Sequence, residues 1–577
     1  MGLYNLLEEK WISVTSDQKG RTEKVSLIEV FENAHKYLGL AGDSETQDFA
    51  VLRVLLAVLH TVFSRFDENG KVYPQIQLDE KFLQKNIIDD EKDIFEYSDS
   101  LFETWKDLWK MDKFPPIVTS YLEKWKDHFY LIDEKYPFYQ VVYEDISADK
   151  INKKEAGKIF GKNVNRLISE SENKTSLFSP KYSKNKSKDK LTYDEIARWI
   201  ITFQGYSGLS DKTTFNRGDY KKSKGWIFDL GGVYLQGSNL FETLMLNLIL
   251  DRDKIDDGKN NIQRPCWEYS GLQNIDRAFR TINPDNLSEL YTNWSRAINI
   301  DVNYQEEDPF FLYAVKMPDL DHRSYYLEPM TIWRFNKQGK NKDYFTPRKH
   351  SPDQSLWRSF GLLVSNSPED TEHRYKKPGI MSWLEKIKGE IGDYDLTVKS
   401  VSMEDDKNAT SWRPTDQICD GLNTKQFILT DIDKNSWTPS INSTIEQTKR
   451  VIGFWYKNFL MDLALIRNDK SSSFVSKNLE QAYFIVDRPF RDWLASLKFE
   501  DDKDDKIFEW RKILKDLIIK EAEEILEAAS PRDYRGREVK INNKGGEEKE
   551  LLNVAIAYNR FEYRVKKDLD LLEKKNG

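Results

Sequence analysis

The most constraining feature of the chain is the helical periodicity of its last part. Four segments of helix length follow one another there: 444–467, 474–497, 506–529 and 548–572. In the third, apolar residues recur at helical spacing until Ser530-Pro531 ends the pattern: Ile507, Trp510, Leu514, Leu517, Ile518, Ile525 and Leu526. Such a stripe is buried against other helices in a folded protein. The spacing therefore predicts a C-terminal four-helix bundle over residues 434–577.

The first 433 residues show a different pattern, with short helical and strand-like segments separated by long irregular stretches. Two β-rich segments flank a turn at 17–20 and are followed by helical periodicity, which predicts a hairpin and a helix. Further helices are predicted at 102–109, 193–203 and 240–250, and strands at 226–230 and 325–328. The predicted fold class is α+β, with a large irregular mixed N-terminal domain over residues 1–433 followed by the bundle.

Composition excludes several classes of protein. Aromatic residues make up 13% of the 577 residues and charged residues 32%, which indicates a folded chain with a polar surface rather than a disordered one. The net charge of −8 argues against a protein that coats nucleic acid over its whole surface, so any such contact is expected to be local.

Cysteine usage and hydropathy bear on the compartment. The two cysteines, Cys266 and Cys419, lie far apart in the sequence and form neither a disulfide framework nor a zinc-binding pair, which favours a reducing cytoplasm. The most apolar segment, 50–63, is interrupted by Arg53 and His60 and is shorter than the roughly 20 residues that span a bilayer. We therefore expect a cytoplasmic protein that does not contact a membrane.

Candidate catalytic groups are sparse. None of the six histidines has a histidine partner four residues away, and the sequence lacks both a Gly-x-Ser-x-Gly nucleophile motif and a Gly-Lys-Ser/Thr phosphate loop. The acidic runs at 404–406 and 501–505 could hold Mg²⁺ for phosphodiester cleavage. A metal-dependent nuclease and a protein-only scaffold therefore remain alternatives, but the sequence favours a noncatalytic protein without metal or cofactor.

Positive charge is concentrated in three segments of this acidic chain. The first carries Lys181, Lys184, Lys186, Lys188 and Lys190 and leads to Gln204-Gly205-Tyr206-Ser207-Gly208, where a glycine turn is predicted. The second carries Lys337, Lys340 and Lys342 around Gly339, and the third Arg217, Lys221, Lys222 and Lys224. Clustered lysines gain free energy by releasing counterions from phosphates, and glycine allows the main chain to approach a groove closely. These segments predict contact with nucleic acid.

Several segments, taken in order, resemble the CasA family, the large subunit of the type I-E CRISPR Cascade complex. They are Asn5-Leu6-Leu7 with Trp11-Ile12-Ser13-Val14, Tyr136-Pro137-Phe138-Tyr139-Gln140, and the segments 173–179, 205–208 and 241–250. The resemblance spans nearly the whole chain. It implies a noncatalytic protein that recognises the short protospacer-adjacent motif (PAM) in double-stranded target DNA, helps to open the duplex, and presents the complex to a helicase-nuclease.

The resemblance also implies roles for individual residues. Phe178, with Lys181, Lys184 and Lys186, is similar in position to the loop that docks at the 5′ end of the guide RNA (crRNA). Gly205, Tyr206, Ser207 and Gly208 match the glycine loop that approaches the PAM from the minor groove, although this chain has fewer glycines there. Lys337, Lys340 or Lys342 corresponds to the lysine finger.

The last implied role concerns strand separation. Asn408, in the loop from Asp405 to Trp412, is the candidate for the wedge that parts the first base pair. It is one methylene shorter than the glutamine of some relatives. Cysteines that some relatives carry near the lysine finger are missing here, so no zinc is expected.

Overall fold

The computed structural model of the chain describes the following residues: 2–164, 190–209, 211–251, 262–281, 283–368, 373–408, 412, 414–543 and 546–572. They form two compact units. The first comprises Met1–Pro352, Ser365–Glu390 and Leu396–Gly421, and the second Asp353–Val364, Ile391–Asp395 and Leu422–Gly577. Where the sequence predicts one boundary after residue 433, the structure places the change near 422 and assigns two earlier segments to the C-terminal unit.

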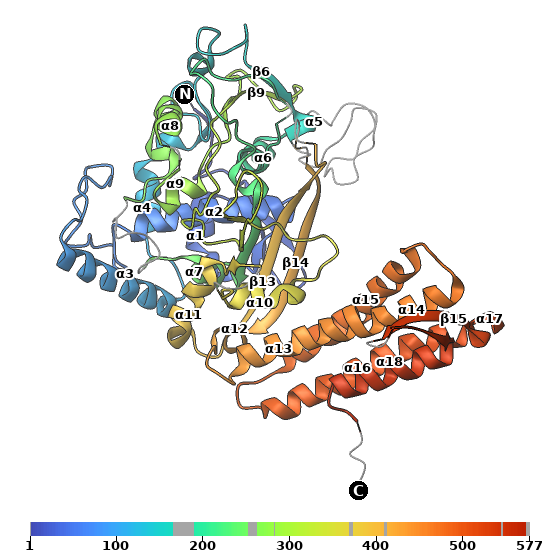
Figure 1. Cartoon of the computed structure of the whole chain (residues 1–577). Coiled ribbons are helices and arrows are strands. Elements are labelled where there is room, and N and C mark those ends of the chain that lie inside the picture. Colours follow the sequence, from blue (N-terminus) through green and yellow to red (C-terminus); the bar gives the residue numbers. More distant parts are fainter. Residues whose placement is uncertain are drawn as a thin grey trace. The chain divides into compact units, whose positions relative to one another are not determined.

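The predicted α+β fold class is confirmed. The helices of the N-terminal unit are α1 (Leu27–Glu32), α2 (Glu45–Phe63), α3 (Glu91–Met111), α4 (Ile117–Lys124), α5 (Gly161–Val164), α6 (Tyr193–Tyr206), α7 (Leu240–Asn247), α8 (Gly271–Arg280), α9 (Leu287–Tyr291) and α11 (Gly379–Ile391). Its 3₁₀ turns are η1 (Ala34–Lys36), η2 (Lys126–His128), η3 (Tyr143–Ile146), η4 (Trp226–Asp229) and η5 (Cys266–Glu268). Figure 1 shows α4, α6, α7 and α9 close to α2.

Helix α2 is the centre of this unit. It is apolar on all sides and buried along nearly its whole length, packing against α4, α6, α7 and α9. Its length and composition would also suit a membrane span, but 94% of its apolar window is buried inside the structure, as expected for the central helix of a core. Ser44 begins the helix by accepting a hydrogen bond from the backbone N–H of Gln47.

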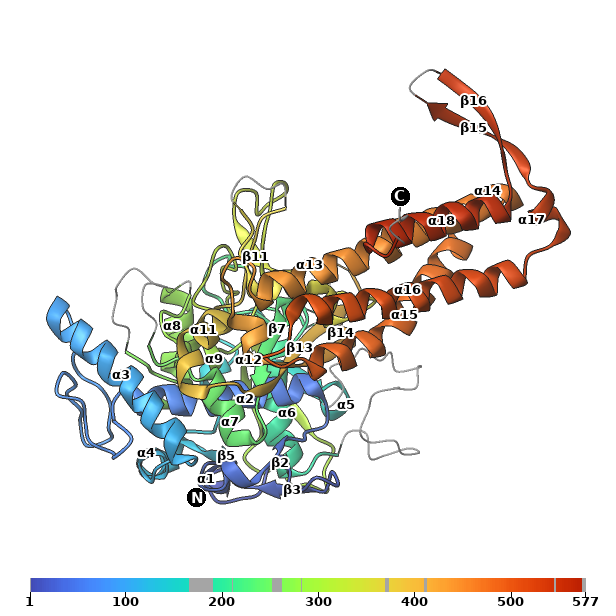
Figure 2. The same ribbon diagram turned by 90° about the horizontal axis from the view of Figure 1, so that it is seen from below.

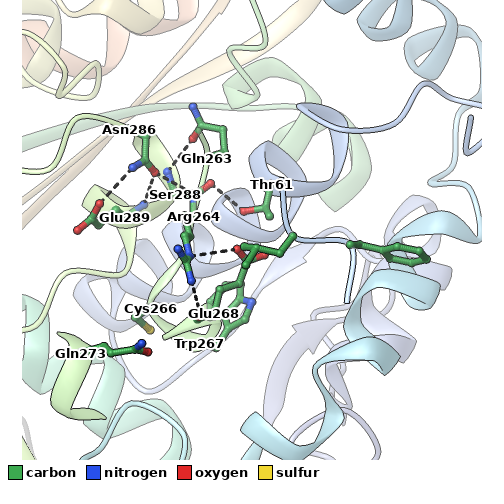
Figure 3. Close-up of polar contacts among 12 residues, drawn as sticks. Thr61, Gln263, Arg264, Cys266, Trp267, Glu268, Gln273, Asn286, Ser288 and Glu289 are labelled. Atoms are coloured by element: carbon green, nitrogen blue, oxygen red, sulfur yellow. Dashed lines mark hydrogen bonds and ion pairs between the residues drawn. The ribbon is translucent and has the colours of Figure 1, made fainter. Parts of the chain in front are cut away.

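Two buried arginines of this region are paired with glutamates. Arg53, on α2, donates two hydrogen bonds to Glu328, at 2.9 and 2.7 Å. Arg65, just beyond α2, does the same to Glu268, at 2.7 and 2.9 Å. Figure 3 shows the surroundings of Glu268, where Ser288 accepts from Thr61 and its backbone N–H donates to Gln263. Pairing makes these buried charges tolerable.

The strands of the N-terminal unit form small, mainly antiparallel sheets instead of one large sheet. Their orders are β3 (Thr22–Val25), β2 (Ile12–Thr15), β4 (Gly39–Leu40); β6 (Gly157–Phe160), β9 (Phe311–Lys316), β8 (Arg296–Asn299); β11 (Phe345–Pro347), β10 (Trp333–Phe335), β12 (Tyr375–Lys376); β14 (Pro414–Lys425), β13 (Asp395–Asp405), β7 (Gly231–Gln236); and β1 (Leu3–Asn5) with β5 (Tyr130–Ile132). The predicted N-terminal hairpin and helix are confirmed as β2, β3 and α1.

Two predicted strands are wrong. Residues 226–229 form the 3₁₀ turn η4, closed by a hydrogen bond from Leu230 N–H to the carbonyl of Ile227, and the strand β7 begins only at Gly231. Residues 325–328 form a turn. The two segments are joined by Glu328, whose carboxylate accepts from Arg53 and from the indole of Trp226.

The C-terminal unit contains the predicted four-helix bundle. Its first helix is continuous through α13 (Trp437–Arg450), the π-helical turn η7 (Val451–Tyr456) and α14 (Lys457–Arg467). The others are α15 (Ser473–Ser496), α16 (Lys503–Glu527) and α18 (Val554–Asp568). Shorter elements are η6 (Leu356–Ser359), α10 (Phe360–Val364), α12 (Gln426–Thr430) and α17 (Pro531–Arg535). Of the predicted apolar stripe of the third segment, Trp510, Leu514 and Ile518 are buried, together with Ala522, whereas Ile507, Leu517, Ile525 and Leu526 are partly exposed.

The start of the fourth predicted helix is wrong. Residues 548–552 belong to β16 (Gly546–Leu552), which pairs with β15 (Arg537–Asn543) in an antiparallel hairpin. Figure 2 shows this hairpin extending beyond α17 and α18. The helix itself begins at Val554, where Asn553 accepts from the backbone N–H of Ile556.

Candidate nucleic-acid interface

The predicted glycine turn is the end of a helix. Gly205 and Tyr206 are the last residues of α6, and Ser207 follows as its cap. Tyr206 and Ser207 are buried, whereas Gly205 and Gly208 are partly exposed. A Cβ on Gly205 would lie 2.5 Å from the side chain of Ile227. The glycine therefore serves close packing of α6 against η4, which the prediction of a turn missed.

The glycine that this region requires for its backbone conformation is Gly225, which the sequence analysis did not single out. Its φ is +90°, a value that L side chains rarely adopt. A Cβ there would overlap the carbonyl groups of Gly205 and Gln204. The Gly225 main chain thus lies directly against the end of α6.

The predicted lysine finger lies on an exposed turn. Lys337, Lys340 and Lys342 all fall between β10 and β11, with Gly339 at a φ of +79°. Asn336 stabilises the turn by donating side-chain hydrogen bonds to the Tyr344 carbonyl and the Thr346 hydroxyl, both at 2.9 Å. The lysines are therefore presented on an ordered hairpin.

Cations cover the base of this hairpin. The Arg374 guanidinium lies 4.3 Å from the ring centre of Phe335, and the Lys376 ammonium 4.1 Å from that of Tyr326. Cation–π contacts of this kind hold a cation at a fixed place without neutralising it. The hairpin consequently adds positive charge at its base as well as at its tip.

The candidate wedge, Asn408, is exposed in the connection between β13 and β14. Its backbone N–H donates to Asp406 at 3.0 Å, and its carbonyl accepts from Trp412 N–H at 2.8 Å. Residues 409–411 and 413 lie outside the described residues, as do Phe178, Lys181, Lys184 and Lys186 of the predicted guide-RNA loop.

The structure brings together the third basic segment, the wedge connection and Lys349. The Lys224 ammonium, from the third basic segment, lies 4.4 Å from the ring centre of Trp412 beside the wedge connection. Lys349, which follows the lysine hairpin, pairs with Asp405 at the end of β13 at 2.9 Å. Segments from three distant parts of the sequence therefore meet around the end of β13.

Asp229 stands between these lysines. Its carboxylate lies 2.7 Å from Lys224, 3.9 Å from Lys349 and 3.8 Å from His322. Burial alone would raise the pKa of the Asp229 carboxyl, but the neighbouring Lys224, His322 and Lys349 outweigh burial and hold the pKa below its usual value. Asp229 is therefore ionised at neutral pH and fixes both ammonium groups. No local sequence pattern distinguishes this residue from other aspartates of the chain.

The acidic runs that could have held a metal have other contacts. Asp405 pairs with Lys349, and Asp502 begins α16 by accepting from Asp505 N–H. Across the part of the chain that the structure describes, no group of three His, Cys, Asp or Glu side chains is placed to hold a metal ion.

Comparison with known proteins identifies the family. The sequence model of the family described as CRISPR-associated protein Cse1 matches residues 5–520. The CRISPR-associated protein CasA/Cse1 of Thermus thermophilus is 24% identical over 401 residues, which cover 68% of this chain but only 65% of that protein, less than two thirds of its length.

Solved structures show the same fold. Thermobifida fusca Cse1 is 22% identical with a TM-score of 0.74 over 99% of both chains. The CasA (Cse1) structure from Thermus thermophilus is 18% identical with a TM-score of 0.63, over 99% of this chain and 100% of that one. A chain of a structure described as a CRISPR RNA-guided surveillance complex is 13% identical with a TM-score of 0.56, over 98% and 100% of the two chains. The resemblance drawn from the sequence is confirmed, and the chain belongs to the Cse1 family of CRISPR-associated proteins.

Proposed function

We propose that this protein is the noncatalytic large subunit of an RNA-guided surveillance complex of type I-E, the Cascade complex. It would bind the guide RNA and the other subunits, recognise the PAM in double-stranded target DNA, assist strand separation, and recruit the helicase-nuclease in the cytoplasm. The observation that carries this proposal is the meeting of Lys224, Lys349 and the Asn408 connection around β13, on a chain of net charge −8.

Each segment has a distinct task in this proposal. Lys337, Lys340 and Lys342 reach the phosphates or the edge of a groove, which positions the duplex. Gly205 and Gly208 are the partly exposed members of the PAM segment, so contact there falls to the main chain near them and not to the buried Tyr206 and Ser207 side chains. Asn408 enters below the PAM, where parting one base step costs a few kcal/mol. Phe178 and the lysines after it face the 5′ end of the guide RNA.

The charges of the site favour binding of nucleic acid over its hydrolysis. Two of the carboxylates nearest the connection, Asp229 and Asp405, are occupied by lysines. A hydrolytic metal needs several oxygen ligands at once, and ammonium groups at these carboxylates would repel it.

The test is reconstitution of the complex with a subunit in which Lys337, Lys340 and Lys342 are all alanine. Duplex binding should weaken, and the slope of log K against log salt should become shallower by about 0.9 for each phosphate that no longer meets a lysine. A matched control replaces three other exposed lysines of the same unit, Lys85, Lys92 and Lys110, which pair with acidic neighbours. That control should bind as the wild type does.

Omitting the subunit altogether is the complementary experiment. Binding of PAM-containing duplex and target cleavage should both disappear from the remaining complex. If both persisted at wild-type level, the proposed function would be wrong. Cleavage of DNA by the isolated protein in a titration with divalent metal would instead favour a nuclease.

A further inference from the structure

Arg296 is a buried arginine whose contacts all lie around the proposed PAM segment. It is the first residue of β8, and its side chain is 0% exposed. Its guanidinium donates to both carboxylate oxygens of Asp211 at 2.8 Å and to the carbonyl of Gly208 at 2.5 Å. The remaining nitrogen donates to the carbonyls of Ser223 and Ser295, at 2.7 and 2.8 Å. All five N–H groups of the side chain are therefore used.

These contacts join two segments that are otherwise separate in sequence. Gly208 and Asp211 follow α6 and continue the proposed PAM segment, whereas Ser223 lies next to Lys222 and Lys224 of the third basic segment. The main chain of Gly225 lies against Gly205 on the same side. Arg296 thus fixes the distance between the PAM segment and the segment of Lys224, whose ammonium lies over Trp412 beside the wedge connection.

The neighbouring side chains hold the same segment from both ends. At its start, Gln204 donates to the carbonyl of Arg296 at 2.9 Å and accepts from the backbone N–H groups of Ser295 and Arg296, at 2.9 and 3.0 Å. Ser207 contacts Ser295 at 2.7 Å. Beyond Gly208, the Lys316 ammonium donates to the carbonyl of Leu209 at 3.0 Å. The segment is therefore attached to β8 and β9 by side chains from both directions.

Arg296 itself cannot be a DNA contact. Its guanidinium is buried, and its charge is paired with Asp211, whose side chain is 8% exposed. It therefore adds no counterion release on binding. A recognition element must nevertheless be held within about half an ångström of its working geometry to discriminate among bases. Arg296 can therefore act on DNA recognition only by positioning the chain segment that it holds.

We propose that Arg296 is a positioning residue that sets PAM discrimination, and not overall DNA affinity, by fixing residues 205–209 and Asp211 relative to residues 217–224. This inference rests on the proposed function. Lysine at this position keeps one positive charge beside Asp211. Its three N–H donors share a single nitrogen, however, so they cannot replace the five N–H donors of the planar guanidinium. The loss of Arg296 should therefore loosen the segment without changing the charges that meet the DNA.

The experiment uses the complete complex, assembled with guide RNA and with either wild-type subunit or the Arg296→Lys variant. A library of PAM triplets first identifies the triplet that the wild-type complex prefers. Equilibrium binding is then measured for a target duplex with that triplet and for one with an altered triplet, at several salt concentrations. The ratio of the two dissociation constants should fall at least about tenfold in the variant, the order of one base contact, while the salt slope stays as in the wild type.

Arg65→Lys is the matched control. Arg65 is equally buried and likewise pairs with a carboxylate, that of Glu268. It also donates to the carbonyls of Phe82 and Gln263, and it lies away from the proposed interface. It should retain the wild-type ratio. Asp211→Asn is a second variant, which removes the carboxylate charge that pairs with Arg296 and leaves the arginine in place. It should reduce the ratio of the two dissociation constants as Arg296→Lys does.

Four outcomes decide the matter. A reduced ratio in Arg296→Lys and Asp211→Asn, with an unchanged ratio in Arg65→Lys, supports the proposal. A wild-type ratio in folded Arg296→Lys complex overturns it, and so does an equal reduction in all three variants, which would reflect general destabilisation. If the wild-type complex itself failed to discriminate among triplets, the proposed function would fall together with this inference, an outcome visible without any variant.

Discussion

Asp48 gives the N-terminal unit a pH dependence that one side chain should control. Its carboxylate accepts from the backbone N–H of Gly42 at 2.8 Å at the start of α2. Burial raises the pKa of this carboxyl to about 7, an effect that the Gly42 hydrogen bond opposes and that Glu45 and Asp43 increase. The folded protein therefore holds this proton more tightly than the unfolded chain does.

The sign of the effect follows from linkage. A carboxyl whose pKa is raised on folding contributes stability that is complete below about pH 4 and is lost as the pH rises through about 7. We predict that Asp48→Asn removes this loss, so that the variant becomes more stable relative to the wild type between about pH 5 and about pH 8. Urea denaturation of the wild type and the variant at these two pH values measures the difference in their free energies of unfolding. The prediction would be refuted if the free energies of unfolding of the wild type and the variant changed by the same amount between the two pH values.

At the scale of single residues, the exposure of charged side chains could be predicted from the sequence better than the backbone role of individual glycines. The lysines around Gly339 could be predicted to be exposed, because a glycine flanked by lysine and amide side chains rarely lies in a core. Gly205 could not be placed correctly, since a missing Cβ serves a helix contact with Ile227 as readily as a ligand contact. Gly225 and Arg296 act through chain segments far away in sequence, and no local pattern reports such contacts.

At the scale of elements, long amphipathic helices were predictable and short strands were not. The stripe containing Trp510 and Leu514 predicts its own burial, because one helix carries the whole signal. The charged residues before Leu552 favour a helix, yet they pair with Val539 and Ile541 across a hairpin. Strand formation depends on the partner strand more than on intrinsic preference, so this error could not be avoided from local pattern alone.

The hairpin of β15 and β16 should be dispensable for the stability of the bundle. Among the described strands, each of the two pairs only with the other, and an isolated two-stranded hairpin is marginal in water. Arg537 and Leu552 are direct cross-strand partners, so a Gly-Gly link can join them when residues 538–551 are removed. We predict a change of less than about 1 kcal/mol in the free energy of unfolding.

The control for this deletion is one inside the bundle. Leu514→Ala, at a fully buried position of α16, should cost about 2–5 kcal/mol through the cavity it leaves. Urea denaturation followed by far-ultraviolet circular dichroism measures both variants. A destabilisation in the hairpin deletion as large as that in Leu514→Ala would show that the hairpin supports the helices.

At the scale of the whole molecule, the C-terminal unit is not a contiguous stretch of sequence. Residues 353–364 and 391–395 precede the bundle but belong to its unit. Trp357 shows why, because its ring lies 4.5 Å from that of Phe490 and its indole N–H donates to Asp487 at 2.8 Å. A boundary drawn where the helical pattern begins separates these partners, since periodicity marks the helices and not what packs on them.

Trp357 should consequently stabilise the bundle from outside its sequence. Its side chain is fully buried, and removing a buried tryptophan typically costs about 3–5 kcal/mol. We predict that Trp357→Ala in the full chain accelerates amide hydrogen exchange in α15 by an amount corresponding to that cost, because Phe490 and Asp487 both lie on α15 and exchange there requires opening of the unit. Phe484→Ala, at a site on the same helix that is 76% exposed, should leave exchange nearly unchanged. Equal exchange in the two variants would mean that the segment 353–364 merely lies beside the bundle, and that residues 422–577 form a stable unit without it.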